Sequence, residues 1–218
     1  MILSRNELIT EVLNTVLIGS DISLVNGSSI DVRLSNKILI EDKPNLKCPK
    51  CNIFIDSNES FFDNEYYSSY ISCTCGYSGS MVQFSKVVDP TKKEQLTLKE
   101  IDIGKGYVIY PGVCFLAATQ ELFYMPSNLS AEFKLKSSVA RIFLNNMLAC
   151  HCDPHWIGSA LTLELQNCTK YHPIKIWGGM KIGQMIFHRN SPVPIEDSYA
   201  VKGQYNNNSE VTASKGAK

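Results

Sequence analysis

The sequence has no excess of charge of either sign and no long hydrophobic run. Lysine plus arginine and aspartate plus glutamate number 21 each in the 218 residues, so no global field attracts the chain to nucleic acid or to a membrane surface. No segment reaches the roughly 18 apolar residues of a membrane span, and the start, MILSRNELITEV, lacks the apolar run of a signal peptide. These absences predict a soluble cytoplasmic protein with one good core.

The eight cysteines are unevenly placed. Four lie in two close pairs, Cys48-Pro-Lys-Cys51 and Cys73-Thr-Cys75, and the other four are scattered. Two thiolate pairs on turns can enclose a tetrahedral zinc ion, and the pattern resembles a zinc ribbon. Four protein ligands leave no open position for water or substrate, so the predicted zinc is structural. The alternative, disulfides or idle thiols, is disfavoured in a reducing compartment.

Short alternating segments predict a mainly β chain. In SIDVRL, Ile30, Val32 and Leu34 share one face, while Asp31 and Arg33 share the other. We expect this aspartate and arginine to pair at the surface or to line a subunit interface. KILIE is expected to form a second short strand, and VCFLAAT, HPIKIW and MKIGQMIF continue the β pattern.

A paired serine, Ser137-Ser138, predicts the start of a short helix. Val139, Ile142 and Phe143 are spaced to share one face of that helix. Hydroxyls, free backbone amides and a preceding lysine would make the helix start an anion site, although most such serines only cap a helix.

The segment SALTLEL predicts a strand with one unusual residue. Leu161, Leu163 and Leu165 point to one face, and Thr162 and Glu164 to the other. A carboxylate in a hydrophobic β framework is costly unless it is paired or functional. Glu164 is therefore the first candidate for a catalytic residue.

The segment CHCDPH, residues 150–155, concentrates thiol, imidazole and carboxylate groups that could form a second metal site. Its proline breaks strand alternation. Core thiols and polar residues that line a pocket are therefore the favoured interpretation.

The composition divides the chain into three parts. Residues 1–42 and 83–200 are expected to form a discontinuous β core, and residues 43–82 a zinc-ribbon insertion. Residues 201–218 are rich in asparagine, serine and lysine without periodicity, which predicts a flexible tail.

Five segments together resemble one known family. NGSSIDVRL, YPGVCFLAAT, SSVAR, ACHCDPHWIGSALTLEL and GGMKIGQMIF, in this order and spacing, are similar to the dCTP deaminase branch of the dUTPase-like superfamily. The resemblance covers most of the chain outside the insertion. It implies a distorted β-barrel or jelly-roll-like dUTPase-like fold with short helices, assembled as a homotrimer with active sites at the subunit interfaces.

The resemblance also implies hydrolytic deamination of a deoxycytidine nucleotide, with dCTP as the expected substrate and dUTP and ammonia as products. Glu164 matches the catalytic glutamate, which would take a proton from the water that attacks C4 and return protons toward N3 and the amine. Ser137 and Arg141 match positions that hold the water and the glutamate, together with the backbone carbonyl of Ala149.

The implied nucleotide contacts come from four places. The helix start would meet the phosphates, which magnesium accompanies, and the Asp-Pro turn and the Glu164 strand would meet the sugar and base. Residues of the tail would close over the nucleotide. The implied substrate-binding residues are Lys136, Ser137, Ser138, Arg141, Asp153, Trp156, Thr162, Glu164, Tyr199, Lys202 and Gln204.

Several departures from the family pattern concern the phosphates. The family's Gly-Arg before the serines is Leu135-Lys136 here, which replaces a bidentate contact by a point charge. Phe143 lies where the family has a glycine, and His155 replaces the glycine of Asp-Pro-Gly-Trp. The tail also lacks most of the usual glycines and glutamines. A substrate at the dCMP level, or a modified cytosine nucleotide, is therefore an alternative.

Other functions depend on particular residues. A bifunctional enzyme that continues to dUMP and diphosphate is close behind, because Asp153 could activate water for attack on phosphate. A pure dUTPase is disfavoured by Trp156, which stands where those enzymes carry tyrosine. A zinc-dependent cytidine deaminase needs His-x-Glu before its cysteines, whereas all four histidines follow the paired cysteines here.

A rival from another class is a catalytically idle module that senses nucleotides or binds proteins through the zinc ribbon. The joint presence of Ser137, Arg141 and Glu164 argues against it, because a decayed site has no need of all three.

Overall fold

The computed structural model describes residues 1–42, 46–55, 70–149 and 151–216, which form two compact units. The first unit comprises Met1–Ile40 and Lys99–Ala213, and the second comprises Glu41–Leu98 with the residues from Ser214 onward. The expected boundaries of the insertion at 43–82 and of the tail at 201–218 stay a prediction. The second unit extends beyond 82, and most of the expected tail belongs to the first unit.

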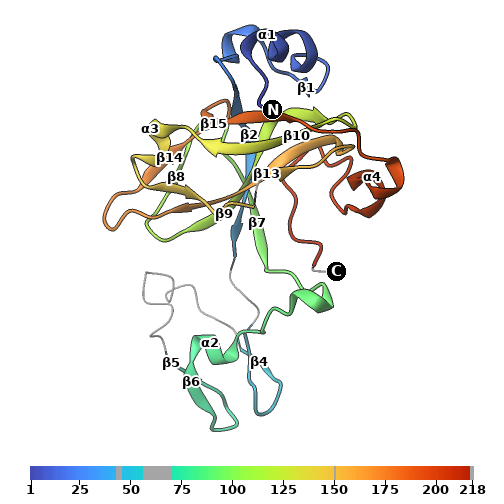
Figure 1. Cartoon of the computed structure of the whole chain (residues 1–218). Coiled ribbons are helices and arrows are strands. Elements are labelled where there is room, and N and C mark those ends of the chain that lie inside the picture. The colour runs from blue at the N-terminus through green and yellow to red at the C-terminus, as the bar shows by residue number, and fades with distance from the viewer. Residues whose placement is uncertain (43–45, 56–69, 150, 217–218) are drawn as a thin grey trace. The chain divides into compact units, whose positions relative to one another are not determined.

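The first unit is built on a nine-stranded sheet whose central strands pair antiparallel, which confirms the mainly β prediction (Figure 1). Its strands follow the order β11-β13-β9-β2-β15-β10-β12, with β1 on β9 and β7 on β2, while β8 and β14 form a separate pair. Its buried apolar side chains form one core. The bounds are β1 Leu17–Ile18, β2 Ile30–Glu41, β7 Leu98–Asp102, β8 Tyr107–Ile109, β9 Cys114–Tyr124, β10 Leu129–Leu135, β11 Leu144–Asn146, β12 His151–Cys152, β13 Ile157–Asn167, β14 Ile174–Ile176 and β15 Lys181–Arg189.

Strand β2 joins the two halves of this sheet by changing partners along its length. Its first residues, 30–33, pair with β15, and residues from Leu34 to Ile40 pair with β9. The register with β9 shifts between Leu34 and Ile38. The two short strands predicted for SIDVRL and KILIE are therefore one bent strand, because the irregularity interrupts the alternation without ending the pairing.

The charged residues of β2 do not pair with each other, which corrects the sequence expectation. Arg33 Nε lies 2.7 Å from Oε1 of Glu121, and its backbone N–H donates to Oε2 at 2.9 Å. The guanidinium also donates to the carbonyl of Gly19 at 2.7 Å. Asp31 instead pairs with Lys136. The Glu121 side chain is fully buried, so this ion pair belongs to the interior of the sheet.

The helical segments in the described part of the chain are short. None of them is long and apolar enough to cross a membrane. They are α1 Arg5–Glu7, η1 Leu8–Val12, η2 Ile22–Leu24, α2 Met81–Phe84, η4 Pro90–Lys92, α3 Ser137–Ala140, η5 Ile195–Asp197 and α4 Tyr199–Lys202.

Helix α3 begins at the predicted serine but ends sooner than its apolar pattern indicates. Val139 is buried, whereas Ile142 and Phe143 are 48% and 66% exposed. Phe143 has a φ of 61°, which leaves the right-handed helical region. The predicted common face of the three residues is therefore wrong, because the backbone turns before Phe143.

The described residues of the second unit form two short hairpins and helical turns. β3 (Leu46–Lys47) pairs with β4 (Phe54–Ile55), and β5 (Tyr70–Ser72) pairs with β6 (Ser78–Ser80). Its small core contains Leu46, Cys48, Cys73 and Phe84. Two cysteine-bearing turns on hairpins agree with the ribbon pattern read from the sequence.

Replacing Glu121 by glutamine tests the buried ion pair. We expect the free energy of unfolding to fall by about 2–4 kcal/mol, because the change leaves the Arg33 guanidinium without a counter-charge. Urea unfolding followed by circular dichroism measures the change. Glu132→Gln is the matched control, since that carboxylate is 42% exposed and its pair with Lys134 is at the surface. Equal stability of both variants would contradict a structural role for the pair.

Candidate functional site

Glu164 lies near the middle of β13, on the face predicted from the sequence. Leu161, Leu163 and Leu165 are buried, and the intervening Thr162 and Glu164 are partly exposed. This alternation places the carboxylate-bearing side chain on the face opposite the leucines.

The strand around Glu164 is held from both sides. On one side Glu164 is the register partner of Leu116 of β9. On the other side β11 pairs with residues 165–167, and the backbone carbonyl of Glu164 accepts from the N–H of Met147 at 2.9 Å. Because β11 also contacts α3, it connects the serine-bearing turn to the strand of Glu164.

An irregularity in β9 lies beside this strand. Ala118 pairs with Thr162 and Leu122 with Ala160, so residues 119–121 of β9 stand opposite the single residue Leu161. The Thr119 hydroxyl accepts from the Leu161 N–H and donates to the carbonyl of Glu121, both at 2.9 Å. The Thr119 side chain thus supplies hydrogen bonds to backbone groups of β9 and β13 where the extra residues interrupt the backbone pairing.

The residues of α3 differ in their surroundings. Ser137, Ser138 and Arg141 are exposed, and no capping bond is formed by the side chain at the N-cap, Lys136. The Lys136 ammonium instead donates to both carboxylate oxygens of Asp31 at 2.8 Å. The structure therefore leaves the serine turn open at the surface and engages the lysine with the sheet.

The Asp-Pro turn leads into β13. The backbone N–H of Trp156 donates to the carbonyl of Asp153 at 3.2 Å, and His155, the third residue of this turn, has a φ of 62°. Asp153 is exposed, with its carboxylate 3.6 Å from His151 Nε2. Ala149 is also exposed, and its carbonyl accepts from the N–H of His151 at 3.2 Å.

The tail residues lie against β13 and Trp156. The Trp156 Nε1–H donates to the carbonyl of Tyr205 at 2.8 Å, and the ring packs 5.4 Å from that of Phe123. Farther along, the N–H of Thr212 donates to the hydroxyl of Thr162 at 3.3 Å. Two residues predicted to contact substrate, Trp156 and Thr162, are therefore both joined to the tail.

The tail residues predicted from the resemblance lie before and within this contact. Burial raises the pKa of the Tyr199 hydroxyl, against hydrogen bonds with the backbone of Tyr205 and Gln204 that lower it. Lys202 lies at the surface, 2.6 Å from Asp197. Gln204 is partly buried. The structure thus brings Tyr199 and Gln204 to the tail contact and leaves Lys202 exposed.

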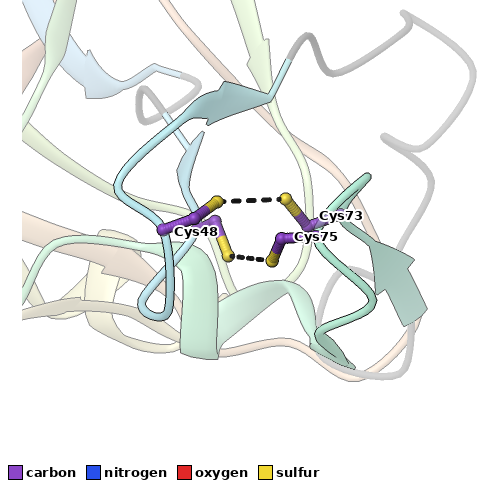
Figure 2. A group of neighbouring side chains, drawn as sticks. Cys48, Cys73 and Cys75 are labelled. Atoms are coloured by element: carbon purple, nitrogen blue, oxygen red, sulfur yellow. Dashed lines mark hydrogen bonds between the residues drawn. The ribbon is translucent and has the colours of Figure 1, made fainter.

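The two cysteine pairs converge in the second unit (Figure 2). The sulfur atoms of Cys48 and Cys75 are 3.6 Å apart, those of Cys51 and Cys73 are 3.5 Å apart, and all four lie within 4.8 Å of one another. A tetrahedral ion with bonds of about 2.3 Å places its sulfur ligands about 3.8 Å apart. The cluster therefore fits a metal ion of the size and geometry of zinc.

The electrostatics of the cluster favour a thiolate. The pKa of Cys73 is lowered to about 6, first by a hydrogen bond with the backbone of Cys75 and then by the neighbouring cysteines, against the effect of burial. The pKa of Cys51 is raised to about 12, since burial and the other thiols outweigh a backbone hydrogen bond at Ile53. Within the cluster Cys73 therefore loses its proton before Cys51.

The alternative second metal site at residues 150–155 has no comparable geometry in the described residues. Among the described residues, three or more possible metal ligands converge at the four-cysteine cluster, and not at residues 151–155. His151 and Asp153 are neighbours and Cys152 is buried, while Cys150 lies outside the described residues.

Two buried carboxylates, Glu121 and Asp31, are not predicted from the sequence. Glu121 and Asp31 are 0% and 4% exposed, although both residue types are usually found at surfaces. Glu121 follows a run of core positions in β9, and a carboxylate at such a position is a signal that a polar partner lies opposite. Asp31 offers no comparable signal, because its partner Lys136 is distant in the sequence.

Comparisons with known proteins place this arrangement in a family. A family model described as dCTP deaminase-like matches residues 69–190, more than half of the chain. A "dCTP deaminase, dUMP-forming" of Corynebacterium glutamicum is 38% identical over 109 residues, which cover 48% of this chain and 57% of that protein. A protein of the same name from Beutenbergia cavernae is 39% identical over 116 residues, with 52% and 59% covered. The chain thus spans somewhat more than half the length of these curated relatives.

A solved structure supports the fold. The crystal structure of 2'-deoxycytidine 5'-triphosphate deaminase from Agrobacterium tumefaciens matches 87% of this chain and 48% of that chain, with a TM-score of 0.54 and 20% sequence identity. At this identity the likeness concerns the fold alone.

Replacing Trp156 by phenylalanine tests the contact between the tail and β13. We expect amide hydrogen exchange in residues 205–212 to become roughly fivefold faster, because a neutral hydrogen bond contributes about 1 kcal/mol. Mass spectrometry of the exchanged peptides measures the effect. Trp177→Phe, which alters the chain's other tryptophan at a 45% exposed position, is the control. Unchanged exchange in the Trp156 variant would show that the indole does not hold the tail.

Proposed function

The chain belongs to the dCTP deaminase-like family, and on this premise we propose that it is an enzyme that removes the amino group of dCTP by hydrolysis. The observation that carries the proposal is the family match over residues 69–190, which includes both α3 and β13. The names of the curated relatives support the same substrate.

Glu164 is the proposed general base and acid. Its carboxylate takes a proton from water as the water oxygen bonds to C4 of cytosine, and passes that proton to N3. It then takes the second proton from the new C4 hydroxyl, which becomes the carbonyl of the product. The carboxylate then returns a proton to the amino group, the C4–N bond breaks, and ammonia leaves. This role is supported by the position of Glu164 on the partly exposed face of an otherwise apolar strand.

Three further groups are proposed to hold the reacting water and the glutamate. They are the Ser137 hydroxyl, the Arg141 guanidinium and the carbonyl of Ala149. All three residues are exposed in the single chain. Their exposure supports a site that is completed when a second subunit covers this surface.

A homotrimer with active sites between subunits is part of the proposal. The segment after α3 exposes apolar side chains, with Phe143 66%, Met147 47% and Leu148 82% exposed. Exposed apolar residues grouped in one segment are typical of surfaces that bind other proteins. Association of identical subunits there would bury these side chains beside Ser137 and Arg141.

Three parts of the chain are proposed to contact the nucleotide: the start of α3, the Asp-Pro turn with β13, and the tail. The phosphates, with their magnesium ion, meet Lys136, Ser137 and Ser138, and the sugar and base meet residues of the Asp-Pro turn and β13. The tail, with Tyr199, Lys202 and Gln204, closes over the nucleotide. The hydrogen bonds between the tail and Trp156 and Thr162 support this closure. The residues proposed for the sugar and base are Asp153, Trp156 and Thr162.

A second candidate is a bifunctional enzyme that continues from dUTP to dUMP and diphosphate. The curated relatives named above are called dUMP-forming, whereas the sequence alone favoured release of dUTP. In this candidate Asp153 activates the water that attacks the phosphate. Its exposed carboxylate, at the start of the turn before Trp156, is compatible with such a role.

The four cysteines are proposed to bind a structural zinc ion. Their spacing fits tetrahedral coordination, and a site with four protein ligands stabilises the hairpins without taking part in the reaction. Such a thiolate site persists in a reducing compartment, which supports a cytoplasmic location. No nucleic acid or membrane partner is part of the proposal.

The activity test uses the purified chain with magnesium and dCTP, dCMP or dUTP. We expect ammonia from dCTP, and its loss by at least about a thousandfold in Glu164→Gln, because the amide cannot take the proton from water. Chromatography of the nucleotides and assays of ammonia and diphosphate measure the products. Diphosphate together with ammonia identifies the bifunctional enzyme.

The matched control for this variant is Glu132→Gln, which changes an exposed carboxylate of β10 in the same way. If the protein released ammonia from none of these nucleotides, the proposed reaction would be wrong. If Glu164→Gln kept full activity, the glutamate would have no part in it.

The zinc proposal predicts one zinc ion per chain, lost in the double variant Cys48→Ser, Cys51→Ser. Serine oxygens replace two thiolates that bind zinc far more strongly. Metal content by mass spectrometry of the purified protein measures the loss. Cys114→Ser with Cys168→Ser is the control, because both thiols are exposed and far from the pairs in sequence. Equal zinc in the two double variants would refute the assignment.

A further inference from the structure

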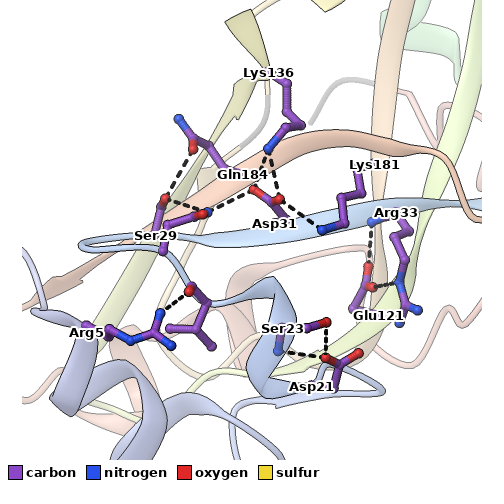
Figure 3. A network of polar contacts seen from close by, with 12 residues as sticks. Arg5, Asp21, Ser23, Ser29, Asp31, Arg33, Glu121, Lys136, Lys181 and Gln184 are labelled. Carbon is purple, nitrogen blue, oxygen red and sulfur yellow. Dashed lines mark hydrogen bonds and ion pairs between the residues drawn. The ribbon is translucent and has the colours of Figure 1, made fainter. Parts of the chain in front are cut away.

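A buried carboxylate on β2 is shared by two lysines from neighbouring parts of the sheet (Figure 3). The side chain of Asp31 is 5% exposed, and its two oxygens each lie 2.8 Å from Lys136 Nζ. Lys181 Nζ lies 3.6 Å from Oδ2 of the same carboxylate. Asn26 donates to Oδ1 at 2.9 Å. The carboxylate is therefore held from three directions.

The two lysines differ from the carboxylate in exposure. The side chains of Lys136 and Lys181 are 29% and 47% exposed, so both ammonium groups have access to solvent while Asp31 does not. Although burial raises the pKa of Asp31, the hydrogen bonds from Lys136 and Asn26 lower it below its usual value. The ionised carboxylate thus depends on cations that can themselves reach the surface.

The other charges around the cluster are already engaged. Arg33, the register partner of Lys181, pairs with Glu121 and donates to the Gly19 carbonyl. The exposed Asp21 carboxylate accepts from the N–H and hydroxyl of Ser23, and these bonds lower its pKa more than the charges of Arg33 and Lys181 do. Lys181 therefore has Asp31 as its ion-pair partner. Two ammonium groups face this single carboxylate, and one of them is enough to balance its charge.

The second lysine matters because Lys136 has two possible tasks. It is the N-cap of α3, directly before the exposed Ser137 and Ser138, where the proposed function places the phosphates. An ammonium group is a point charge and lacks the flat fork with which a guanidinium can meet two anions at once. When Lys136 turns toward phosphate, its two contacts with Asp31 are weakened or lost, and a buried carboxylate that loses its cation is strongly unfavourable.

We propose that Lys181 is a positioning residue for nucleotide phosphates: it keeps Asp31 neutralised so that Lys136 can leave that carboxylate and bind phosphate. This inference rests on the proposed function and deepens it. Lys181 contributes through Asp31, and its contribution grows with the number of phosphates that draw Lys136 away.

The test compares Lys181→Gln with Lys134→Gln, which changes a 53% exposed lysine of β10. We expect Lys181→Gln to weaken binding of dCTP about tenfold, the size of one charge-assisted hydrogen bond, and to leave binding of deoxycytidine unchanged. The KM for dCTP should rise by the same factor while kcat changes less than about twofold. Lys181→Arg should restore binding. Isothermal titration calorimetry and steady-state kinetics measure these quantities.

A double-mutant cycle shows whether Lys181 acts through Asp31. In an Asp31→Asn protein, Lys181→Gln should have no further effect on dCTP binding, because the neutral amide needs no cation. A tenfold loss in this background as well would overturn the inference and make Lys181 a direct phosphate ligand. Unchanged dCTP binding in Lys181→Gln itself would also overturn it.

Two measurements separate this inference from the proposed function: dCTP binding tests the inference, and ammonia release tests the deaminase proposal. If the unaltered protein binds dCTP with this dependence on Lys181 but releases no ammonia, the inference stands and the deaminase proposal falls. If it releases ammonia and Lys181→Gln binds dCTP normally, the deaminase proposal stands and the inference falls. Absence of any dCTP binding by the unaltered protein overturns both. Thermal unfolding of each variant shows that the comparison is made between folded proteins.

Discussion

The ion pair between Arg33 and Glu121 lies where strand β2 passes from one partner to the other. At this point the backbone N–H of Arg33 would have no partner in the sheet, and it donates to the Glu121 carboxylate instead. The same carboxylate neutralises the guanidinium, so one side chain satisfies both a backbone and a charged donor. A bent strand with an unsatisfied buried donor would be costly, and the continuity of the nine-stranded sheet therefore depends on this contact.

The position of Glu121 in turn depends on the irregularity in β9, and this connects the ion pair to the candidate site. Extra residues at 119–121 displace the strand opposite Leu161, and the Thr119 hydroxyl bridges the interrupted ladder. Beyond the irregularity the register with β13 is regular again from Thr162. The irregularity adds two residues to β9, so it keeps the alternation of faces along that strand, and the face on which Glu164 lies follows from the alternation within β13 itself.

The elements predicted well from sequence are those whose signal is local. The alternation of Leu161, Leu163 and Leu165 assigned the faces of β13 correctly, and the spacing of two cysteine pairs indicated the cluster that the structure forms. The partners of Asp31 and Arg33 were missed, because they come from strands distant in sequence and alternation says nothing about which strands become neighbours. Glu164 is a catalytic candidate from its place in the strand, whereas the roles of Ser137 and Arg141 come from the resemblance, and all three roles stay predictions.

Two of the departures from the family pattern lie at residues whose backbone conformation is unfavourable for a side chain with a Cβ. Phe143 and His155 both have positive φ, at 61° and 62°, and the resemblance implies a glycine at each of these positions. A residue with a Cβ pays about 1 kcal/mol for this conformation. His155 regains part of it within the chain, since its Nε2 lies 3.1 Å from the carbonyl of Val193. Phe143 does not: its ring is 66% exposed and adds apolar surface next to α3. Its backbone is held within the chain by a hydrogen bond from the Cys168 N–H to the Phe143 carbonyl at 2.9 Å, so the turn is fixed by the backbone and not by the ring.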